Sequence, residues 1–353
     1  MPTPTIPAGN LFMNATTYTG TGASQTVVNG VAGQSFQPDF VWIKSRSAAT
    51  SNLLYDSVRS ATYYLVSNST STEGVGATTL TSFLSGGFQL GSDSGAAGVN
   101  VNAATYVGWQ WKAGGTAVSN TSGSITSTVS ANTTSGFSIV TYTGNGITSA
   151  TVGHGLGAIP SMIIVKGRSV TYDWFVRHQS LPTGYQLRLN TTAAQEQVSS
   201  ATTSGGLGTP NSSTFGFIAG ATDTANVNQN GATYVAYCWA PIAGYSAFGS
   251  YTGNGSTDGP FIYTGFRPRF VMIKCSSAAG NDWPIIDTSR ATYNVAGPEL
   301  YADLSQAEST SNYIDIVSNG FKIRSTGGQV NTSATTYIYA AFAENPFKYA
   351  NAR

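Results

Sequence analysis

Three copies of one pattern run through the chain, and this repetition constrains the fold more than any other feature. Each copy has a Pro followed by an apolar run that ends in Lys: PDFVWIK ends at Lys44, PSMIIVK at Lys166 and PRFVMIK at Lys274. Successive lysines lie more than a hundred residues apart. This spacing is typical of domains, since the units of a solenoid are roughly 20 to 50 residues long. The sequence therefore predicts three separate domains.

The borders of the copies follow from two further motifs. Each copy opens on a Tyr-Thr-Gly turn and closes on a strand-like block such as ATYVGWQW, ATYVAYCW or TTYIYAAF. The predicted divisions are an extended N-terminal arm at 1–16, repeat domains at 17–113, 136–241 and 246–345, and a C-terminal tail at 346–353. Residues 114–135 are rich in Gly, Ser and Thr, which indicates either a flexible linker or one extended strand lying along a neighbour.

Composition selects the fold class. The 353 residues include 41 Gly, 12% aromatic residues and only 9% charged residues, while 41% are hydrophobic. Gly-rich turns and aromatic strands favour β-structure, and the apolar content is high enough for a packed core. Short runs with alternating apolar and polar residues indicate antiparallel strands with one exposed face. We therefore predict an all-β protein of three tandem antiparallel β-sandwich domains related by the internal repeat.

Several large side chains are predicted to lie in the core. Trp111, Trp239 and Phe342 each stand five positions after a repeated Tyr, so the same strand places them at equivalent sites. Cys238 and Cys275 lie inside apolar runs, which indicates two buried free thiols rather than a disulfide.

The charge balance argues against several partners. The 16 Lys and Arg against 15 Asp and Glu leave a net charge of +1, which provides no broad positive field for nucleic acid or an anionic membrane. No run approaches the roughly 20 apolar residues of a membrane-spanning helix, and the first residues lack the regions of a signal peptide. We expect no nucleic-acid partner, no membrane insertion and no signal peptide.

The pattern of titratable residues does not indicate an enzyme. Glycan hydrolysis needs a pair of carboxylates in one cleft, but the acidic residues are scattered and no pair recurs in all three copies. His154 and His178 are the only histidines, and they are too far from the cysteines for a zinc site. The segment GHGLG around His154 lacks the Lys-Ser/Thr of a phosphate loop and is read as a turn. We expect no catalytic residue, metal or cofactor.

Two groups of residues remain as candidates for binding. The repeated lysines are followed two residues later by Arg46 and Arg168, and in the third copy by Ser276. They form either an anion site or a set of structural cations at strand ends, paired with a carboxylate such as Asp56 or Asp287. We favour the structural interpretation, since a repeated residue usually serves the fold of its domain.

Two tryptophans are the candidates for sugar binding. Trp174 and Trp283 follow the lysine strands in loop-like segments. They are interpreted either as exposed platforms for glycan stacking or as packing over the edge of the sandwich.

The motifs, taken in order, resemble those of one protein family. YTGNG, PDFVWIK, YDSVRS, SGGFQLG and ATYVGWQWKAGG resemble a domain family, often in tandem, of tail fibre and other virion structural proteins of phages, including marine phages and cyanophages. The second copy departs from it, because VRHQS at 176–180 replaces the Asp and Arg of the other two copies.

The resemblance implies a non-enzymatic phage virion protein, assembled in the host cytoplasm. A tail fibre or adhesin-type component for host attachment is the first expectation. The alternatives are a capsid decoration or head-fibre protein, with its three domains over a capsid symmetry axis, and a module that binds host surface glycans. The implied partners are other virion subunits, a host glycan, and further copies in a homo-oligomer such as a trimer.

Overall fold

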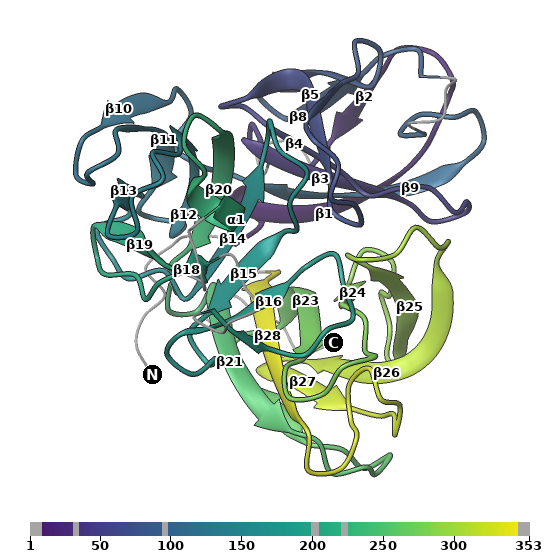
Figure 1. The fold of residues 1–353 in the computed structure, drawn as a ribbon. Coiled ribbons are helices and arrows are strands. Elements are labelled where there is room, and N and C mark those ends of the chain that lie inside the picture. Colours follow the sequence, from purple (N-terminus) through teal and green to yellow (C-terminus); the bar gives the residue numbers. More distant parts are fainter. Residues whose placement is uncertain (1–8, 31–34, 94–97, 199–204, 220–224, 345–353) are drawn as a thin grey trace.

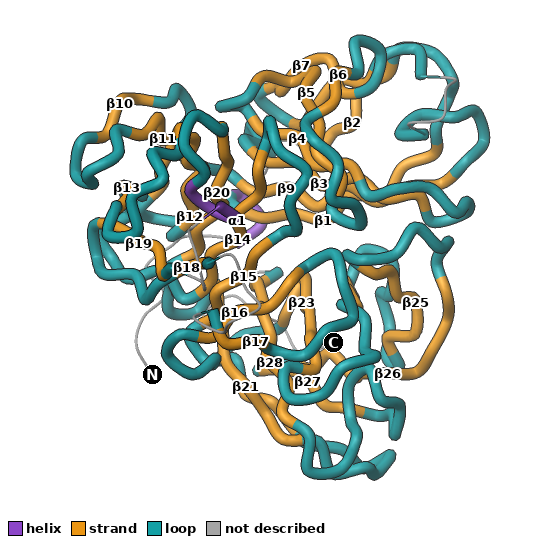
Figure 2. Tube along the Cα trace, in the orientation of Figure 1, coloured by secondary structure: helices purple, strands orange, loops and turns teal. Residues whose placement is uncertain are grey.

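The computed structural model describes residues 9–30, 35–93, 98–198, 205–219 and 225–344. Strands dominate this part of the chain, and its helical elements are one short α-helix, α1 (Ala225–Asn228), and one 3-10 turn, Gly9–Leu11. Figure 2 shows the helix as a single purple segment among orange strands. The prediction of an all-β protein is confirmed. No helix among the described residues is both long and apolar enough to cross a membrane.

The strands fall into three groups, named here repeat 1 (9–113), repeat 2 (114–241) and repeat 3 (242–344). The large sheet of repeat 1 has the order β1 (Met13–Thr19), β9 (Thr105–Trp111), β3 (Phe40–Ser45), β4 (Leu53–Asp56), β5 (Ser60–Val66) and β6 (Gly74–Val75). Its small sheet has the order β2 (Gln25–Val28), β8 (Gly87–Leu90) and β7 (Leu80–Leu84).

Repeat 2 also has a large and a small sheet. The large sheet contains β10 (Val118–Asn120), β11 (Ser127–Asn132), β12 (Phe137–Thr143), β20 (Thr233–Trp239), β14 (Met162–Gly167), β15 (Phe175–His178), β16 (Tyr185–Arg188) and β17 (Glu196–Gln197). The small sheet contains β13 (Thr151–Gly153), β19 (Thr214–Ile218) and β18 (Gly206–Leu207).

Repeat 3 joins its strands into one sheet. The order is β21 (Ser246–Thr252), β28 (Thr336–Ala343), β23 (Pro268–Cys275), β24 (Pro284–Asp287), β25 (Ala296–Tyr301), β26 (Ser309–Val317), β27 (Gly320–Ile323) and β22 (Phe261–Tyr263). The two groups of strands that are separate sheets in the other repeats are joined here by the pairing of β25 with β26.

One pairing order recurs in all three repeats: β1-β9-β3-β4-β5, β12-β20-β14-β15-β16 and β21-β28-β23-β24-β25. Within it, Lys44 pairs with Val107, Lys166 with Val235 and Lys274 with Ile338. Each of these partners directly follows the Tyr of the closing block. The three lysines therefore hold equivalent positions in the fold, as the constant spacing from Pro to Lys predicts.

The lysine strands are apolar on consecutive positions because both of their faces are covered. In β3, Val41 and Ile43 face a core between the two sheets of repeat 1, whereas Phe40 and Trp42 belong to a cluster shared with the other repeats. Figure 1 shows the three repeats as lobes around a common centre. The repeats are thus packed together, in contrast to the separate domains that the spacing of the lysines suggested.

Two predicted segment borders need correction. Residues 114–135 are not a flexible linker, because β10 and β11 extend the large sheet of repeat 2 by pairing with each other and with β12. The predicted arm at 1–16 is too long, because Met13 to Thr16 already belong to β1 and pair with β9. The remainder of that arm up to residue 8 and the predicted tail 346–353 lie outside the described residues.

Candidate functional site

The repeats meet at an apolar centre that we call the central core. It encloses a cavity of about 20 Å³ and consists of equivalent residues from the three repeats: Phe40, Trp42 and Trp111; Met162, Ile164 and Trp239; Phe270, Met272, Ala340 and Phe342. The ring of Trp111 packs edge-on against Trp239 and Phe342, with ring centroids 6.1 and 5.6 Å apart. The predicted burial of Trp111, Trp239 and Phe342 is confirmed, because each is at most 5% exposed.

The repeated lysines connect the repeats around this core. Each ammonium group donates to a backbone carbonyl of another repeat: Lys166 Nζ to Thr70 O at 3.0 Å, Lys274 Nζ to Thr191 O at 3.4 Å and Lys44 Nζ to Ser305 O at 3.0 Å. All three side chains are buried, and burial lowers the pKa of each lysine to about 8. Their acceptors are backbone carbonyl groups rather than the carboxylates that the structural interpretation of these cations expects. An open anion site is not formed.

The two candidate tryptophans have the same role as the lysines. Trp174 and Trp283 are buried, and their indole N–H groups donate to Val66 O at 2.9 Å and to Arg188 O at 3.1 Å, each in the preceding repeat. Asn52 holds the equivalent place in repeat 1 and donates to Tyr301 O of repeat 3. The hypothesis of exposed glycan-stacking platforms is therefore wrong, since neither ring offers a face to solvent.

Two of the three contacts between repeats also contain ion pairs. Arg168 binds both carboxylate oxygens of Glu73 in repeat 1, at 3.0 and 2.8 Å, and Arg46 binds both oxygens of Glu308 in repeat 3, at 2.9 Å each. Each glutamate also pairs with an arginine of its own repeat, Arg59 at 2.8 Å or Arg290 at 3.1 Å. Sequence analysis identified Arg46 and Arg168 but missed the glutamates, because they are distant in sequence.

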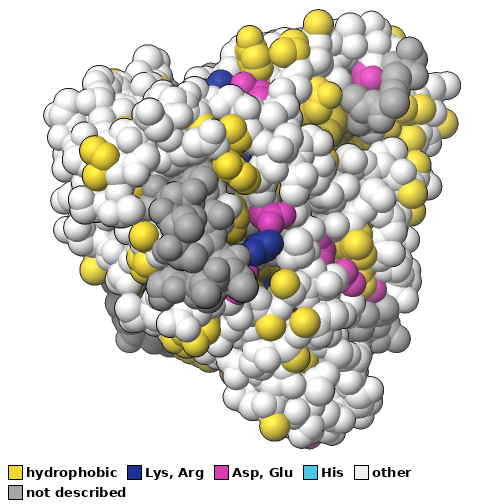
Figure 3. Space-filling model, viewed as in Figure 1, with side chains coloured by type: hydrophobic (Ala, Val, Ile, Leu, Met, Phe, Trp, Pro, Cys, Tyr) yellow, Lys and Arg dark blue, Asp and Glu magenta, His cyan; other side chains and the backbone are white. Residues whose placement is uncertain are grey.

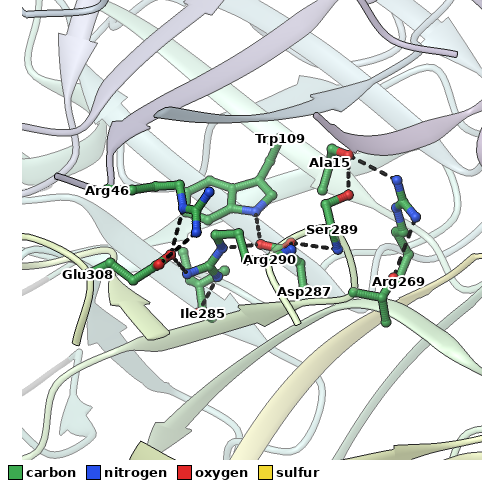
Figure 4. Close-up of polar contacts among 10 residues, drawn as sticks. Ala15, Arg46, Trp109, Arg269, Ile285, Asp287, Ser289, Arg290 and Glu308 are labelled. Carbon is green, nitrogen blue, oxygen red and sulfur yellow. Dashed lines mark hydrogen bonds and ion pairs between the residues drawn. The ribbon is translucent and has the colours of Figure 1, made fainter. Parts of the chain in front are cut away.

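Behind these pairs lies a buried carboxylate. Figure 4 shows the contact between repeats 3 and 1, in which Asp287 accepts from Arg290 Nε at 2.6 Å and from Trp109 Nε1 of repeat 1 at 2.9 Å. Burial by itself would raise the pKa of Asp287, but the guanidinium group and the indole N–H outweigh it and hold the pKa below its usual range. In the contact between repeats 1 and 2, Asp56 accepts from Tyr237 Oη at 2.8 Å in the same way.

The third contact, between repeats 2 and 3, lacks this network. His178 stands at the position of the buried Asp, and Leu181 at the position of the Arg that pairs with this Asp in the other contacts. Gln195 replaces the Glu, and Ser276 replaces the Arg that binds this Glu from the next repeat. Ala340 replaces the aromatic residue that donates to the Asp. The backbone contact persists, because Gln195 N donates to Ser276 O at 2.8 Å, as Glu73 N does to Arg168 O. His178 Nε2 is 3.2 Å from Tyr339 O, and burial lowers its pKa to about 4, so the imidazole is neutral at pH 7.

The departures that sequence analysis noted separately, VRHQS and Ser276, thus lie in one contact. Repeat 2 donates to repeat 1, repeat 3 to repeat 2, and repeat 1 to repeat 3. Because each repeat uses the same surfaces, the contacts close a ring with approximate three-fold symmetry.

Other reactive groups are buried and dispersed. Cys238 and Cys275 are free and buried, as predicted, and burial raises the pKa of the Cys238 thiol to about 12. His154 directly follows β13, and its Nε2 is 3.1 Å from Asn211 O. Among the described residues, no three His, Cys, Asp or Glu side chains gather into a group that could hold a metal ion. On the face in Figure 3, charged side chains are few and scattered.

Comparison with known proteins gives one match. A family model described as "Domain of unknown function (DUF7483)" matches residues 8–346, a single span that includes all three repeats. No curated protein and no solved structure matches the chain.

Proposed function

The chain belongs to this family of unknown function, and we propose that it is a non-enzymatic structural protein of a phage virion, with a tail fibre or adhesin-type component as its first assignment. The resemblance of its repeated motifs to virion proteins suggests the class. The ring of three repeats is the observation that supports a structural role. Its partners are then other subunits of the particle.

The proposal includes an origin for the ring. We propose that the repeats are three tandem antiparallel β-sandwich domains that arose from one unit and pack as a homotrimer would, but within one chain. The recurring strand order and the equivalent lysines support this view. In repeats 1 and 2 the large and small sheets bury a common set of side chains, as sandwich packing requires.

A structural role agrees with the chemistry of the groups that recur among the repeats. The repeated lysines, the paired arginines and the two loop tryptophans all bind another repeat, and the lysines and tryptophans are buried. Such contacts stabilise a block that presents its outer loops in a fixed arrangement. They offer no carboxylate pair in a cleft for acid and base catalysis.

A cryo-EM map of the intact virion tests this proposal. Density for the ring at the tail would support the first assignment, and a particle without the protein would contradict the whole proposal. A second test deletes Met1 to Pro7. The truncated protein should fold, because it keeps every strand of repeat 1 from Met13 onward, but it should no longer be incorporated into particles if the arm docks on the virion.

A capsid decoration protein is the second candidate, and the approximate three-fold symmetry of the ring favours it. A single chain with this symmetry matches a three-fold position on a capsid without forming a homotrimer. Light scattering on the purified chain separates the two arrangements, since the homo-oligomer expected for a fibre would have a multiple of the 36.6 kDa chain mass. Density at capsid three-fold axes in the same map would select decoration over the fibre.

A further inference from the structure

The outer face of repeat 3 carries two exposed aromatic rings. Phe261 and Tyr263 lie on β22 and are 48% and 58% exposed, whereas Ile262 between them is buried in the core. Successive side chains of a strand point to opposite faces of its sheet, so both rings stand on the outer face, about 7 Å apart along the strand. Single exposed apolar residues are common on protein surfaces, but two large rings on one face of one strand form a platform.

The other two repeats have small residues at these positions. The strand pairings establish the equivalence, because Ile262, Val27 and Val152 each pair with a buried Phe of the adjacent strand. The residues equivalent to the two ring positions are Thr26 and Val28 in repeat 1 and Thr151 and Gly153 in repeat 2. The fold does not require the rings, since two copies of the same strand pairing form without them.

Paired charges surround the rings on the same face. Lys322 on β27 stands directly opposite Phe261, and its ammonium group lies 2.7 Å from the Asp258 carboxylate. Asp315 on β26 stands opposite Lys322 and accepts from Arg324 Nε at 2.6 Å. The four charges balance in two pairs. The face therefore offers hydrogen-bond donors and acceptors side by side without a net charge.

The size of this face distinguishes between kinds of partner. A large aromatic side chain has a surface of roughly 150–250 Å², so two rings that are about half exposed offer roughly 200 Å². A stable protein complex buries about 800 Å² on each partner, which is several times more. A sugar chain needs less, because the C–H face of one pyranose covers one ring and its hydroxyl groups both donate and accept hydrogen bonds. The balanced charges match a neutral sugar chain.

We propose that the outer face of β22, β27 and β26 binds a neutral oligosaccharide. Pyranose rings stack on Phe261 and Tyr263, and the sugar hydroxyl groups bond to the paired charges of Lys322 and Asp258. As the host contact of an adhesin-type component, this site rests on the proposed function. The binding of sugar by the purified chain does not depend on that function.

A glycan array tests this proposal, with the labelled full chain applied to immobilised neutral gluco-, galacto- and manno-oligosaccharides beside acidic ones. The native chain should bind neutral members of the array saturably. The double variant Phe261→Thr with Tyr263→Val, which has the residues of repeat 1 at these positions, should lose roughly tenfold or more in affinity, since both stacking contacts are removed. Its melting temperature should stay within about 2 °C of the native value, because both positions are exposed.

Two single variants serve as further checks. Tyr63→Thr removes a ring that is 37% exposed on β5 of repeat 1, and it should leave sugar binding unchanged because this residue lies in another repeat. Lys322→Gln copies Gln89, the equivalent residue of repeat 1, and should weaken binding while both rings remain.

Three results would overturn this assignment. They are binding to no neutral oligosaccharide, binding to acidic oligosaccharides alone, and equal binding by the native chain and the double variant. Loss of self-association in the double variant without any sugar binding, measured by light scattering, would give the face to a second copy of the chain instead. The virion map answers separately whether the protein is in the particle, so a failed sugar site and a failed virion assignment are distinguishable.

Discussion

At the scale of single residues, one polar position differs among the three repeats. Asn68 and Asn190 each accept a backbone N–H through Oδ1, from Asn52 and Trp174 at 2.9 Å, and Asp303 does the same for Trp283. The second oxygen of Asp303 is buried without a hydrogen bond, and burial raises the pKa of this carboxyl to about 7. The acid is thus less suited to this site than the amide in the other two repeats.

Replacing Asp303 with Asn should stabilise the protein in a pH-dependent way. A folded-state pKa above the ordinary value means that the carboxyl favours folding at low pH and loses this contribution as the pH rises from about 4 through 7. Asn does not titrate. The melting temperature of D303N should therefore exceed that of the native chain by about 2 to 4 °C at pH 8 and by less at pH 5, measured by calorimetry.

The converse change at the sister position is the control for this prediction. Asn190→Asp should lower the melting temperature at pH 8 more than at pH 5, because it places a new carboxylate against Asp173, whose Oδ1 accepts from Asn190 Nδ2 at 2.7 Å in the native chain. Equal effects of D303N at both pH values would show that the Asp303 carboxyl titrates normally.

Residues that lie side by side in sequence could be assigned from the pattern, and those that meet across repeats could not. The constant offset placed Lys44, Lys166 and Lys274 correctly because the strand register is local. Trp174 and Trp283 look exposed in sequence because each follows an Asp in a loop-like segment, yet the carbonyls that bind them come from another repeat. Nothing local to a tryptophan encodes such a distant partner.

At the scale of the elements, the two sequence departures, VRHQS in repeat 2 and Ser276 in repeat 3, belong to the same contact between repeats. Sequence analysis found all-β structure from turn residues and alternation, but it left 114–135 open between a flexible linker and one extended strand lying along a neighbour. Its small residues gave β11 no apolar signal, since this strand obtains its hydrogen bonds from the edge of β12. The ion pairs between repeats could not be predicted from the sequence either, because the two partners of each pair come from different repeats.

The missing ion pair between repeats 2 and 3 can be restored by two substitutions. Gln195→Glu and Ser276→Arg recreate the arrangement of Glu73 with Arg168, whose side chains are 11% and 24% exposed. A double-mutant cycle in urea should give a favourable coupling of about 1 kcal/mol at low salt that decreases in 1 M NaCl. Each single variant should be less stable than the native chain, because each adds an unpaired charge. Coupling that is absent at low salt would contradict the equivalence of the three contacts.

At the scale of the whole molecule, the central core decides how the chain unfolds. Each repeat contributes large side chains to it, so a repeat on its own would expose groups such as Trp239, which is 5% exposed here. Buried aromatic side chains of this size contribute about 3 to 5 kcal/mol each, comparable with a large part of the net stability of a domain. The three repeats therefore depend on one another.

Calorimetry of the full chain should consequently show one cooperative transition, with calorimetric and van 't Hoff enthalpies that agree. Isolated repeat 2, residues 114–241, should be unfolded or aggregate. Trp239→Ala in the full chain should lower the temperature of the single transition without splitting it into several. Trp239→Phe is the matched control, because Phe342 already holds the equivalent position in repeat 3, and its effect should be smaller. Three resolved transitions, or a stable isolated repeat 2, would instead mean that each repeat folds on its own core and that the central contacts only fix the orientation of folded repeats.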